Sequence, residues 1–387
     1  MSRIMVQATL ALLLSLALSD ASADTTFDFK GYIKMDVLST YYRSGDVSPE
    51  SPLRDFHFPA AIPTGGTDEN YDLDFHAKES RFAFETNTDL GDGQSIKAFL
   101  EFDFLLSPAG DERVSNSWNP RLRHVYMTYD RWLLGQTWST FMIVVIPEDL
   151  DFAGAAEGIV FIRQPQIRFN WNQWQFAIEN PETVVTDFQT GARITTESGR
   201  VPDLVVRRNF SGDRGSLGVA GIARFLHFQS PSADIDDQNF GFGFTGGGEL
   251  EVGEKDGLKA QLTVGRGLGR YVGLNFVNSA VLDADSNLET IGQVAGFVDY
   301  RHWWNDRLRS SANLSVYFAD NDAALTGPNV NQAAQSISVN LLYSPKPPLT
   351  FGVEYMHAQR ELEGGADGTM DRLQFSARHA FGYASPR

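Results

Sequence analysis

Hydrophobic and polar residues alternate along most of the chain. Between residues 27 and 37 the odd positions are apolar or glycine, whereas the even positions are charged apart from Tyr32. The same period of two recurs over residues 96–104, 258–264, 311–318 and 349–355. Such alternation is typical of β-strands with one apolar and one wet face. Runs of about ten residues have the length that a tilted strand needs to cross a membrane.

The alternating runs are separated by two kinds of connection. Short turn signals lie at residues 89–93, 130–131, 172–173, 211–213, 254–257, 305–306 and 346–348. Longer polar stretches lie at residues 40–74, 106–120, 142–162, 181–202, 228–238, 268–290, 320–332 and 361–371. These seven turns and eight loops would join about sixteen strands of an all-β, antiparallel sheet. An even strand number, with short turns at one end and long loops at the other, predicts a transmembrane β-barrel with periplasmic turns and extracellular loops.

A β-propeller is the competing explanation of a hairpin that recurs along the chain. A propeller blade of the WD40 type is about 40 to 45 residues long, which is close to the spacing of the predicted hairpins. A blade must fit four short strands into each repeat. Each repeat in this chain instead holds two long alternating runs and one long loop, so strand length favours the barrel.

The N-terminus has the features of an export signal. Arg3 precedes an apolar run over residues 8–18, and Ala21-Ser22-Ala23 provides the small-x-small pattern of a signal peptidase site. We therefore predict a signal peptide over residues 1–23 and a single transmembrane barrel domain over residues 24–387. No later apolar run reaches the roughly 20 residues that a transmembrane helix needs. These features place the protein in the bacterial outer membrane.

Composition and motifs exclude several classes of function. The net charge of 32 − 49 = −17 excludes a nucleic-acid binder with a basic surface. The absence of cysteine excludes disulfides, a thiol nucleophile and cysteine-ligated metals. Residues 241–246 match GxGxxG, but the glycines alternate with phenylalanine as in a strand, and no helix follows. Residues 283–287 begin like a calcium loop but lack its glycine and its bidentate glutamate. We therefore predict no cofactor and no metal site.

The chain shows no catalytic motif either. Neither H-E-x-x-H nor G-x-S-x-G occurs, and the seven histidines have no metal-ligand spacing. The sequence thus predicts that the protein is not an enzyme. An outer-membrane barrel enzyme stays as an alternative, and it would need a Ser/His/Asp set near the rim of the membrane.

Arginines gather on the predicted lumen face in the first half of the chain. Arg121 and Arg123 share one face of a strand, Arg81 lies on an earlier strand, and Arg163 and Arg168 flank a later one. A row of guanidinium groups in a water-filled pore lowers the barrier for anions, and each planar fork can bind a carboxylate through two hydrogen bonds. The other interpretation is that these arginines only solvate the wall and pair with lumen carboxylates.

The third long loop combines acidic residues with apolar ends. Its carboxylates are Glu148, Asp149, Asp151 and Glu157. The flanking segments 141–146 and 158–162 are too apolar for a loop that is bathed in water. We therefore expect this loop to fold into the lumen and narrow the channel. An external lid is the alternative, and a loop that plugs the lumen completely would favour a structural or adhesive surface protein.

Several segments resemble the DcaP-like family of trimeric outer-membrane porins. The segments that carry the resemblance are residues 31–36, 75–82, 120–126, 134–142 and 163–168. The resemblance implies a sixteen-stranded barrel, a homotrimer, an inward-folded third loop and diffusion of small organic acids, dicarboxylates included. Position by position, it implies that Arg81, Arg121, Arg123, Arg163 and Arg168 are anion contacts.

The sequence thus predicts a passive porin that prefers anionic organic acids and transports them without a cofactor. Its expected partners are small anionic solutes, two further copies of the chain, outer-membrane lipid and lipopolysaccharide. Acidic clusters in the loops, such as Asp283 with Asp285 and Asp320 with Asp322, suggest weak divalent-cation sites that bridge to lipopolysaccharide.

Overall fold

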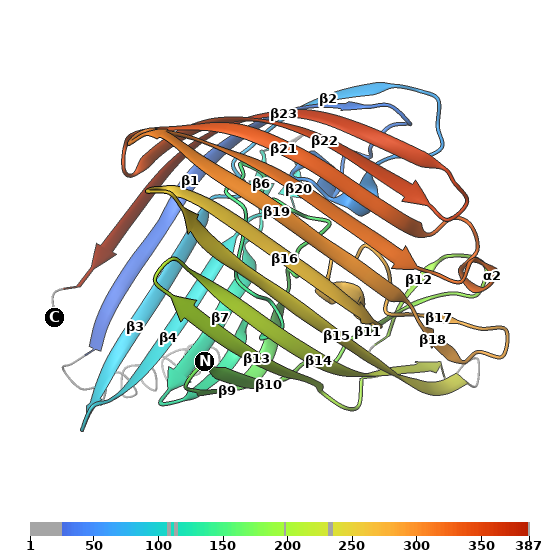
Figure 1. Ribbon diagram of the computed structural model, residues 1–387, viewed down its shortest axis with the longest axis horizontal. Coiled ribbons are helices and arrows are strands. Elements are labelled where there is room, and N and C mark those ends of the chain that lie inside the picture. Colours follow the sequence, from blue (N-terminus) through green and yellow to red (C-terminus); the bar gives the residue numbers. More distant parts are fainter. Residues whose placement is uncertain (1–24, 107–109, 112–114, 197–198, 231–234, 386–387) are drawn as a thin grey trace, which may run out of the picture.

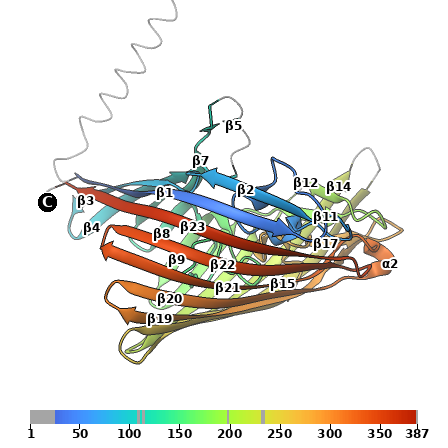
Figure 2. The ribbon, with the colours of Figure 1, turned by 90° about the horizontal axis from the view of Figure 1, so that it is seen from above.

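A computed structural model describes residues 25–106, 110–111, 115–196, 199–230 and 235–385. The predicted signal peptide lies outside these residues. Most of the described chain forms long antiparallel strands that close into a tilted barrel, and the first described strand begins at the rim where the last one ends (Figure 1). Turned by 90°, the same strands form a long, inclined wall (Figure 2). Among the described residues, no helix combines the length and apolar character needed to span a bilayer.

One sheet of 17 strands builds the wall. Its first eight strands are β1 (Thr25–Tyr42), β2 (Asn70–His76), β3 (Arg81–Gly91), β4 (Gln94–Asp103), β7 (Arg121–Tyr129), β8 (Trp132–Trp138), β9 (Arg163–Trp171) and β10 (Trp174–Glu179). The other nine are β13 (Asp203–Gly212), β14 (Gly215–Ser230), β15 (Ile235–Val252), β16 (Asp256–Arg266), β19 (Gly292–Asn305), β20 (Leu308–Asp320), β21 (Asn331–Lys346), β22 (Leu349–Leu362) and β23 (Asp367–Ala384).

Pairing of the first and last strands closes the barrel. Strand β1 pairs antiparallel with β23, so that Ile33 lies opposite His379. The other edge of β1 pairs first with β3 and then with β2, which are two halves of one wall strand interrupted at residues 77–80. Counting these halves as one strand, the described wall has 17 − 1 = 16 strands. The predicted all-β barrel is therefore confirmed.

The two faces of the wall differ as the alternation predicts. On β20, Leu314 and Phe318 are 53% and 54% exposed, whereas Asn313 and Ser315 are buried. Most of the other strands also expose apolar side chains, and together these side chains form a continuous outer band that contacts lipid instead of water. The polar face consequently lines the lumen.

All seven short turns are confirmed. The turn of β7 and β8 consists of residues 130–131, and that of β9 and β10 consists of residues 172–173. Asp130 and Asn172 have φ angles of 51° and 53°, the left-handed conformation that tight hairpins need and that Asp and Asn tolerate better than most residues.

Two of the predicted long loops are wrong in length. Strand β22 continues to Leu362 and β23 begins at Asp367, so the predicted loop over residues 361–371 is a turn of residues 363–366. Strand β14 likewise extends to Ser230 and β15 begins at Ile235, inside the predicted loop 228–238. Beyond the apolar band both faces of a strand contact water, so polar residues occur on both faces. The hydrogen bonds between the strands continue there, although the sequence no longer alternates.

Two long loops build a second sheet at the end of the barrel opposite the short turns (Figure 1). Its strands are β11 (Thr183–Thr186), β12 (Arg193–Thr196), β17 (Ala280–Leu282) and β18 (Leu288–Thr290). Strands β11 and β17 come from different loops and pair in parallel, with Val185 opposite Ala280. The helix α2 (Ala323–Thr326) contacts this sheet, and a small hairpin of β5 (Gly110–Asp111) and β6 (Ser117–Trp118) lies in another loop.

A buried arginine fixes both of these loops to the wall. Arg224 of β14 donates hydrogen bonds to the carbonyl oxygens of Glu182 in one loop, at 2.5 Å, and of Gly267 in the other, at 2.7 Å. Its Nε lies 3.1 Å from the Asp203 carboxylate. Because a buried guanidinium needs its charge compensated and its donors satisfied, this contact set holds the two loops in one position.

The two ends of the barrel give the first testable prediction. Asp92, in a short turn, and Asp285, in a long loop, are both exposed to solvent, so each can be replaced by a single cysteine for labelling. We expect a membrane-impermeant thiol reagent to label only the Asp285→Cys protein in intact cells, and both proteins after the cells are opened. Labelling of Asp92→Cys alone in intact cells would reverse the orientation.

Candidate functional site

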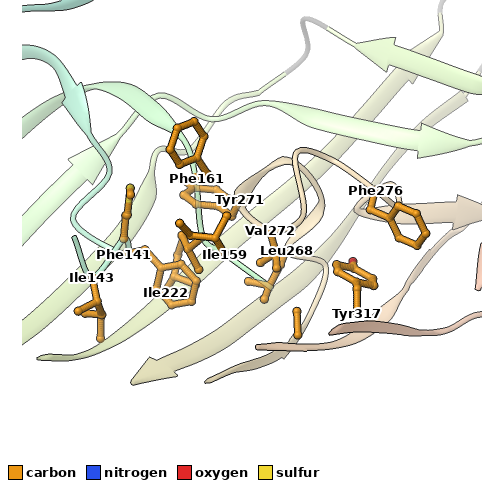
Figure 3. Close-up of a cluster of buried hydrophobic side chains, with 14 of the residues drawn as sticks. Phe141, Ile143, Ile159, Phe161, Ile222, Leu268, Tyr271, Val272, Phe276 and Tyr317 are labelled. Atoms are coloured by element: carbon orange, nitrogen blue, oxygen red, sulfur yellow. The ribbon is translucent and has the colours of Figure 1, made fainter. Parts of the chain in front are cut away.

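The segment between β8 and β9, residues 139–162, lies against the polar inner face of the wall. Phe141, Met142 and Ile159 are fully buried. The apolar ends of this segment belong to one buried cluster with Ile222 of β14 and Tyr317 of β20, and Figure 3 shows residues of this cluster. The same cluster includes Leu268, Tyr271, Val272 and Phe276 of the loop that follows β16. Burial in this cluster explains why the segment carries apolar residues that an exposed loop would not.

Short polar side chains on the wall satisfy the backbone of this segment. Ser311 Oγ and Asn340 Nδ2 each donate a hydrogen bond of 2.8 Å to the carbonyl oxygen of Glu148. The backbone N–H of Gly158 donates to Ser315 Oγ, also at 2.8 Å. A buried irregular backbone requires such partners, because water cannot reach it. The rows of Ser and Asn on the inner faces of β20 and β21 therefore form the surface that binds the segment.

Glycine at position 158 is required by close approach to the wall. A Cβ atom there would lie 2.1 Å from the carbonyl oxygen of Gly296 on β19. The two backbones are thus in direct contact, and any side chain at this position would push them apart.

Two of the four acidic residues of the segment bind strands β19 and β20 of the wall. Glu148 pairs with Arg309 of β20 at 2.6 Å and with Arg301 of β19 at 3.6 Å. Asp149 accepts a hydrogen bond of 3.0 Å from Asn313 of β20. Each of these carboxylates is therefore engaged with the wall formed by β19 and β20.

The other two acidic residues bind the first long loop. Asp151 accepts a 2.7 Å hydrogen bond from the backbone N–H of His57, and Glu157 Oε1 lies 2.5 Å from His57 Nε2. Ser336 of β21 donates to Glu157 at 2.8 Å. His57 and Glu157 are both fully buried, so this pair joins the two loops to each other and to the wall.

Burial changes the charge state of the loop carboxylates. Burial raises the pKa of Asp149 well above its usual range, and the neighbouring Glu354 and Asp299 carboxylates raise it further. Burial also acts to raise the pKa of Glu157, but His57 and the hydrogen bonds that Glu157 accepts outweigh it and leave the pKa lowered. The raised pKa of Asp149 favours its neutral form relative to that of an exposed aspartate.

Three of the predicted arginines converge on two carboxylates of β4. Arg121 binds Asp103 through two hydrogen bonds of 2.8 and 2.7 Å. Arg123 lies 2.7 Å from Glu101 and 3.0 Å from Asp103. Arg81 lies 3.7 Å from Glu101. The hydrogen-bonded register of β4 and β7 brings these groups together, since Asp103 pairs directly with Arg121.

Arg163 joins the same cluster without a carboxylate. Its guanidinium lies 4.6 Å from the Trp138 ring centroid, and the Arg123 guanidinium lies 5.9 Å from the same ring. Its Nη1 is buried and has no hydrogen-bond partner within the described residues. Phe152 of the third loop lies 5.3 Å from Arg121 and 5.4 Å from Arg123. Three guanidinium groups thus share two carboxylates and Arg163 adds a fourth guanidinium, which leaves a formal charge of 4 − 2 = +2.

Arg168, the fifth predicted contact, has a different environment. It donates hydrogen bonds to the Trp138 carbonyl oxygen at 2.6 Å and to Gln166 Oε1 at 3.0 Å. It therefore binds the start of the third loop rather than the carboxylates of β4. Arg207 of β13 acts in the same way on the Met142 carbonyl oxygen, at 2.7 Å.

Several residues of the site escape sequence reasoning. Glu101 and Asp103 lie on the wet face of an alternating run, but only the strand register shows that they pair with Arg121 and Arg123. His57 gives no sequence signal, because its partner Glu157 lies 100 residues away. In the described part of the chain, no three His, Asp or Glu side chains are placed to hold a metal ion.

A closed barrel with an apolar outer band, a charged lumen and short turns at one end defines an outer-membrane channel. The family model described as DcaP outer membrane protein matches residues 22–381. The chain therefore belongs to the DcaP outer membrane protein family, and it is a channel of the bacterial outer membrane. The structural neighbours described next are named a channel, a porin and an outer membrane protein.

Solved structures confirm the fold. The outer membrane channel DcaP of Acinetobacter baumannii is 22% identical, with 93% of this chain and 98% of that chain covered and a TM-score of 0.75. The anion-selective porin from Comamonas acidovorans is 12% identical, with 92% and 100% covered and a TM-score of 0.55. The trimer form of OmpT from Vibrio cholerae is 10% identical, with 92% and 100% covered and a TM-score of 0.53. None of the curated protein sequences compared with this chain matches it.

Proposed function

We propose that this channel is a passive pore that prefers small anionic organic acids, dicarboxylates among them. The observation that carries the proposal is a separation of charge inside the barrel. Three guanidinium groups on β3 and β7 share two carboxylates and Arg163 of β9 lies beside them, whereas the third-loop carboxylates pair with β19, β20, β21 and the first long loop. Loop carboxylates therefore do not neutralise the arginine cluster.

Local charge decides selectivity in a narrow pore. Exposed charges farther than about 8 Å from the path are largely screened at physiological salt. Much of the net charge of −17 lies in exposed loops and turns, such as Asp92 and Asp285. The third loop narrows the path and brings passing solutes close to the cluster, so the arginines outweigh the acidic total.

Arg163 adds a positive charge to the cluster that none of the cluster's carboxylates pairs with. Its Nη1 is buried and has no hydrogen-bond partner among the described residues, so Arg163 attracts a solute carboxylate through its charge and does so without breaking an existing ion pair. A solute carboxylate can contact the partly exposed Arg121, which two hydrogen bonds to Asp103 hold in place, whereas the buried Arg123 contributes its charge without contact. Several contacts of moderate strength allow entry without trapping the solute.

Two structural neighbours support the proposal. One structural neighbour is an anion-selective porin, and another is solved as a trimer. Both share the fold of this chain at low identity. We therefore propose that this chain also forms a homotrimer whose three pores prefer anions.

The test is the conductance of the purified protein in a planar bilayer under a salt gradient. We expect open channels whose reversal potential indicates anion preference, and faster permeation of a small dicarboxylate than of a neutral sugar of similar size. Cation preference would reject the anion-selective pore. A protein that folds but does not conduct would instead support a structural or adhesive barrel plugged by the third loop.

A further inference from the structure

The lipid-facing surface of the barrel carries a groove that the pore does not use. The groove runs over β13 to β20 and has a volume of 920 Å³. Its floor consists of four small outward-facing residues, Gly246, Gly248, Ala260 and Gly296. Its sides include the exposed leucines Leu217, Leu262 and Leu314.

Strand register makes the floor continuous. Gly248 pairs with Ala260 across β15 and β16, and Leu262 pairs with Gly296 across β16 and β19. Small residues on neighbouring strands lower the wall, while the adjacent leucines stand above it. Such an apolar groove on the lipid face has the shape and polarity of a site for acyl chains.

Two arginines lie at the short-turn end of this surface. Arg214, in the turn of β13 and β14, lines the groove. Arg208 of β13 lines an adjoining depression that shares Gly246 and Leu262 with the groove. Its guanidinium lies between the rings of Trp174, at 5.1 Å, and Phe210, at 4.7 Å. Aromatic residues at this depth are typical of the membrane–water boundary.

Neither arginine has an acidic partner in the part of the chain that the structure describes. Within the described residues, no carboxylate lies within ion-pair distance of Arg208 or Arg214, and the buried Nε of Arg208 has no hydrogen-bond acceptor. Glu249 lines the groove, but it lies on the opposite parity of β15 from Gly246 and Gly248. A guanidinium that is fixed between rings and lacks an acceptor is suited to bind a phosphate.

We propose that this groove binds one glycerophospholipid of the inner leaflet, with its acyl chains on the glycine floor and its phosphate at Arg208 and Arg214. The short turns face the periplasm, where the leaflet consists of phospholipid, so lipopolysaccharide is at the wrong end of the barrel. A second copy docked symmetrically would bring like charges together and leave the arginines without an anion. The site is independent of the solute that the pore carries.

Variants that fill the groove test the acyl-chain part of the site. A Cβ atom at Gly246 would meet its nearest neighbours at 3.8 and 3.9 Å, which is ordinary contact, so Gly246→Val combined with Ala260→Leu fits the backbone. The matched control is Ala98→Leu on β4, a lipid-facing alanine outside the groove. Arg208→Gln combined with Arg214→Gln tests the phosphate part and leaves the floor unchanged.

Native mass spectrometry of the delipidated protein, titrated with phosphatidylglycerol in detergent, measures the result. We expect one tightly bound lipid per wild-type and Ala98→Leu barrel, and a severalfold loss of binding in both double variants. Diacylglycerol, which lacks the phosphate, should bind no better to wild type than to the arginine variant. Equal lipid binding by all proteins, or no binding by wild type, overturns the proposal. A groove-filled variant that keeps its lipid but changes its oligomeric mass shows that the groove is a protein interface instead.

Discussion

Replacing residues 143–158 with a short Gly-Ser linker is expected to raise the single-channel conductance severalfold. These residues occupy lumen space along β19 to β22, where they bind Ser311, Ser315, Asn340 and Glu354. The wall strands close through their own ladders, so the barrel does not require the loop to remain closed. Single-channel recordings of the purified proteins in planar bilayers provide the measurement.

A point substitution tests the contact between the third loop and the wall with a smaller change than the linker does. Gly158→Ala places a Cβ atom 2.1 Å from the Gly296 carbonyl oxygen, so the loop must move away from β19. We expect a larger or noisier conductance and a lower melting temperature. The control is Gly382→Ala, whose Cβ would meet its nearest atom at 3.5 Å, an ordinary contact. Unchanged conductance in both the linker variant and Gly158→Ala would show that the loop does not limit the path.

Neutralising Arg121 and Arg123 together is expected to move the reversal potential toward cations. The double change to Gln lowers the formal charge of the cluster from +2 to zero. Each unit charge contributes about 1 kcal/mol at 4 Å in water, so a monoanion loses about 2 kcal/mol before salt screening. Because 1.4 kcal/mol is a factor of ten, the permeability ratio should change roughly 10- to 100-fold. Dicarboxylate uptake should fall more than uptake of a neutral sugar.

Two single variants control for damage to the fold. The double change leaves Asp103 buried without its partners, which costs about 3–5 kcal/mol in comparable sites. Arg163→Gln removes one charge and breaks no ion pair, so its smaller shift toward cations reports charge alone. Glu101→Gln should move the reversal potential in the opposite direction, toward anions. If all three variants keep the reversal potential of the wild-type channel, these arginines only pair with the carboxylates of the wall.

Most of the fold can be predicted from the sequence, because the alternation of apolar and polar residues within each strand identifies both the strand and its lipid-facing side. Residues 96–104 and 258–264 show which face meets lipid before any pairing is known. Turn positions are equally local, since Asp130 and Asn172 are residues that accept the turn conformation. Strand ends are less certain. Around residues 361–371 the strands leave the membrane, and polar residues then occupy both faces of a continuing ladder.

The candidate site is only partly visible in the sequence, because it depends on pairs from distant strands. Alternation places Arg121 and Arg123 on the lumen face, but it does not show that Asp103 and Glu101 already bind them. Nor does it show which way the third-loop carboxylates turn. Glu148 meets Arg309 from a strand that lies 161 residues later, and only the closed barrel brings the two together.

The parallel pairing of β11 with β17 affects what can be recognised at the cell surface. Val185 and Ala280 lie 95 residues apart in the chain yet side by side in one sheet, fixed from below by Arg224. Val185 and Ala280 are themselves buried, but their pairing holds the exposed parts of both loops together, so a phage or an antibody that binds there meets a composite epitope that neither loop presents as an isolated peptide. Sequence changes that evade such a binder must preserve the pairing of two loops at once, which restricts how freely either loop can vary.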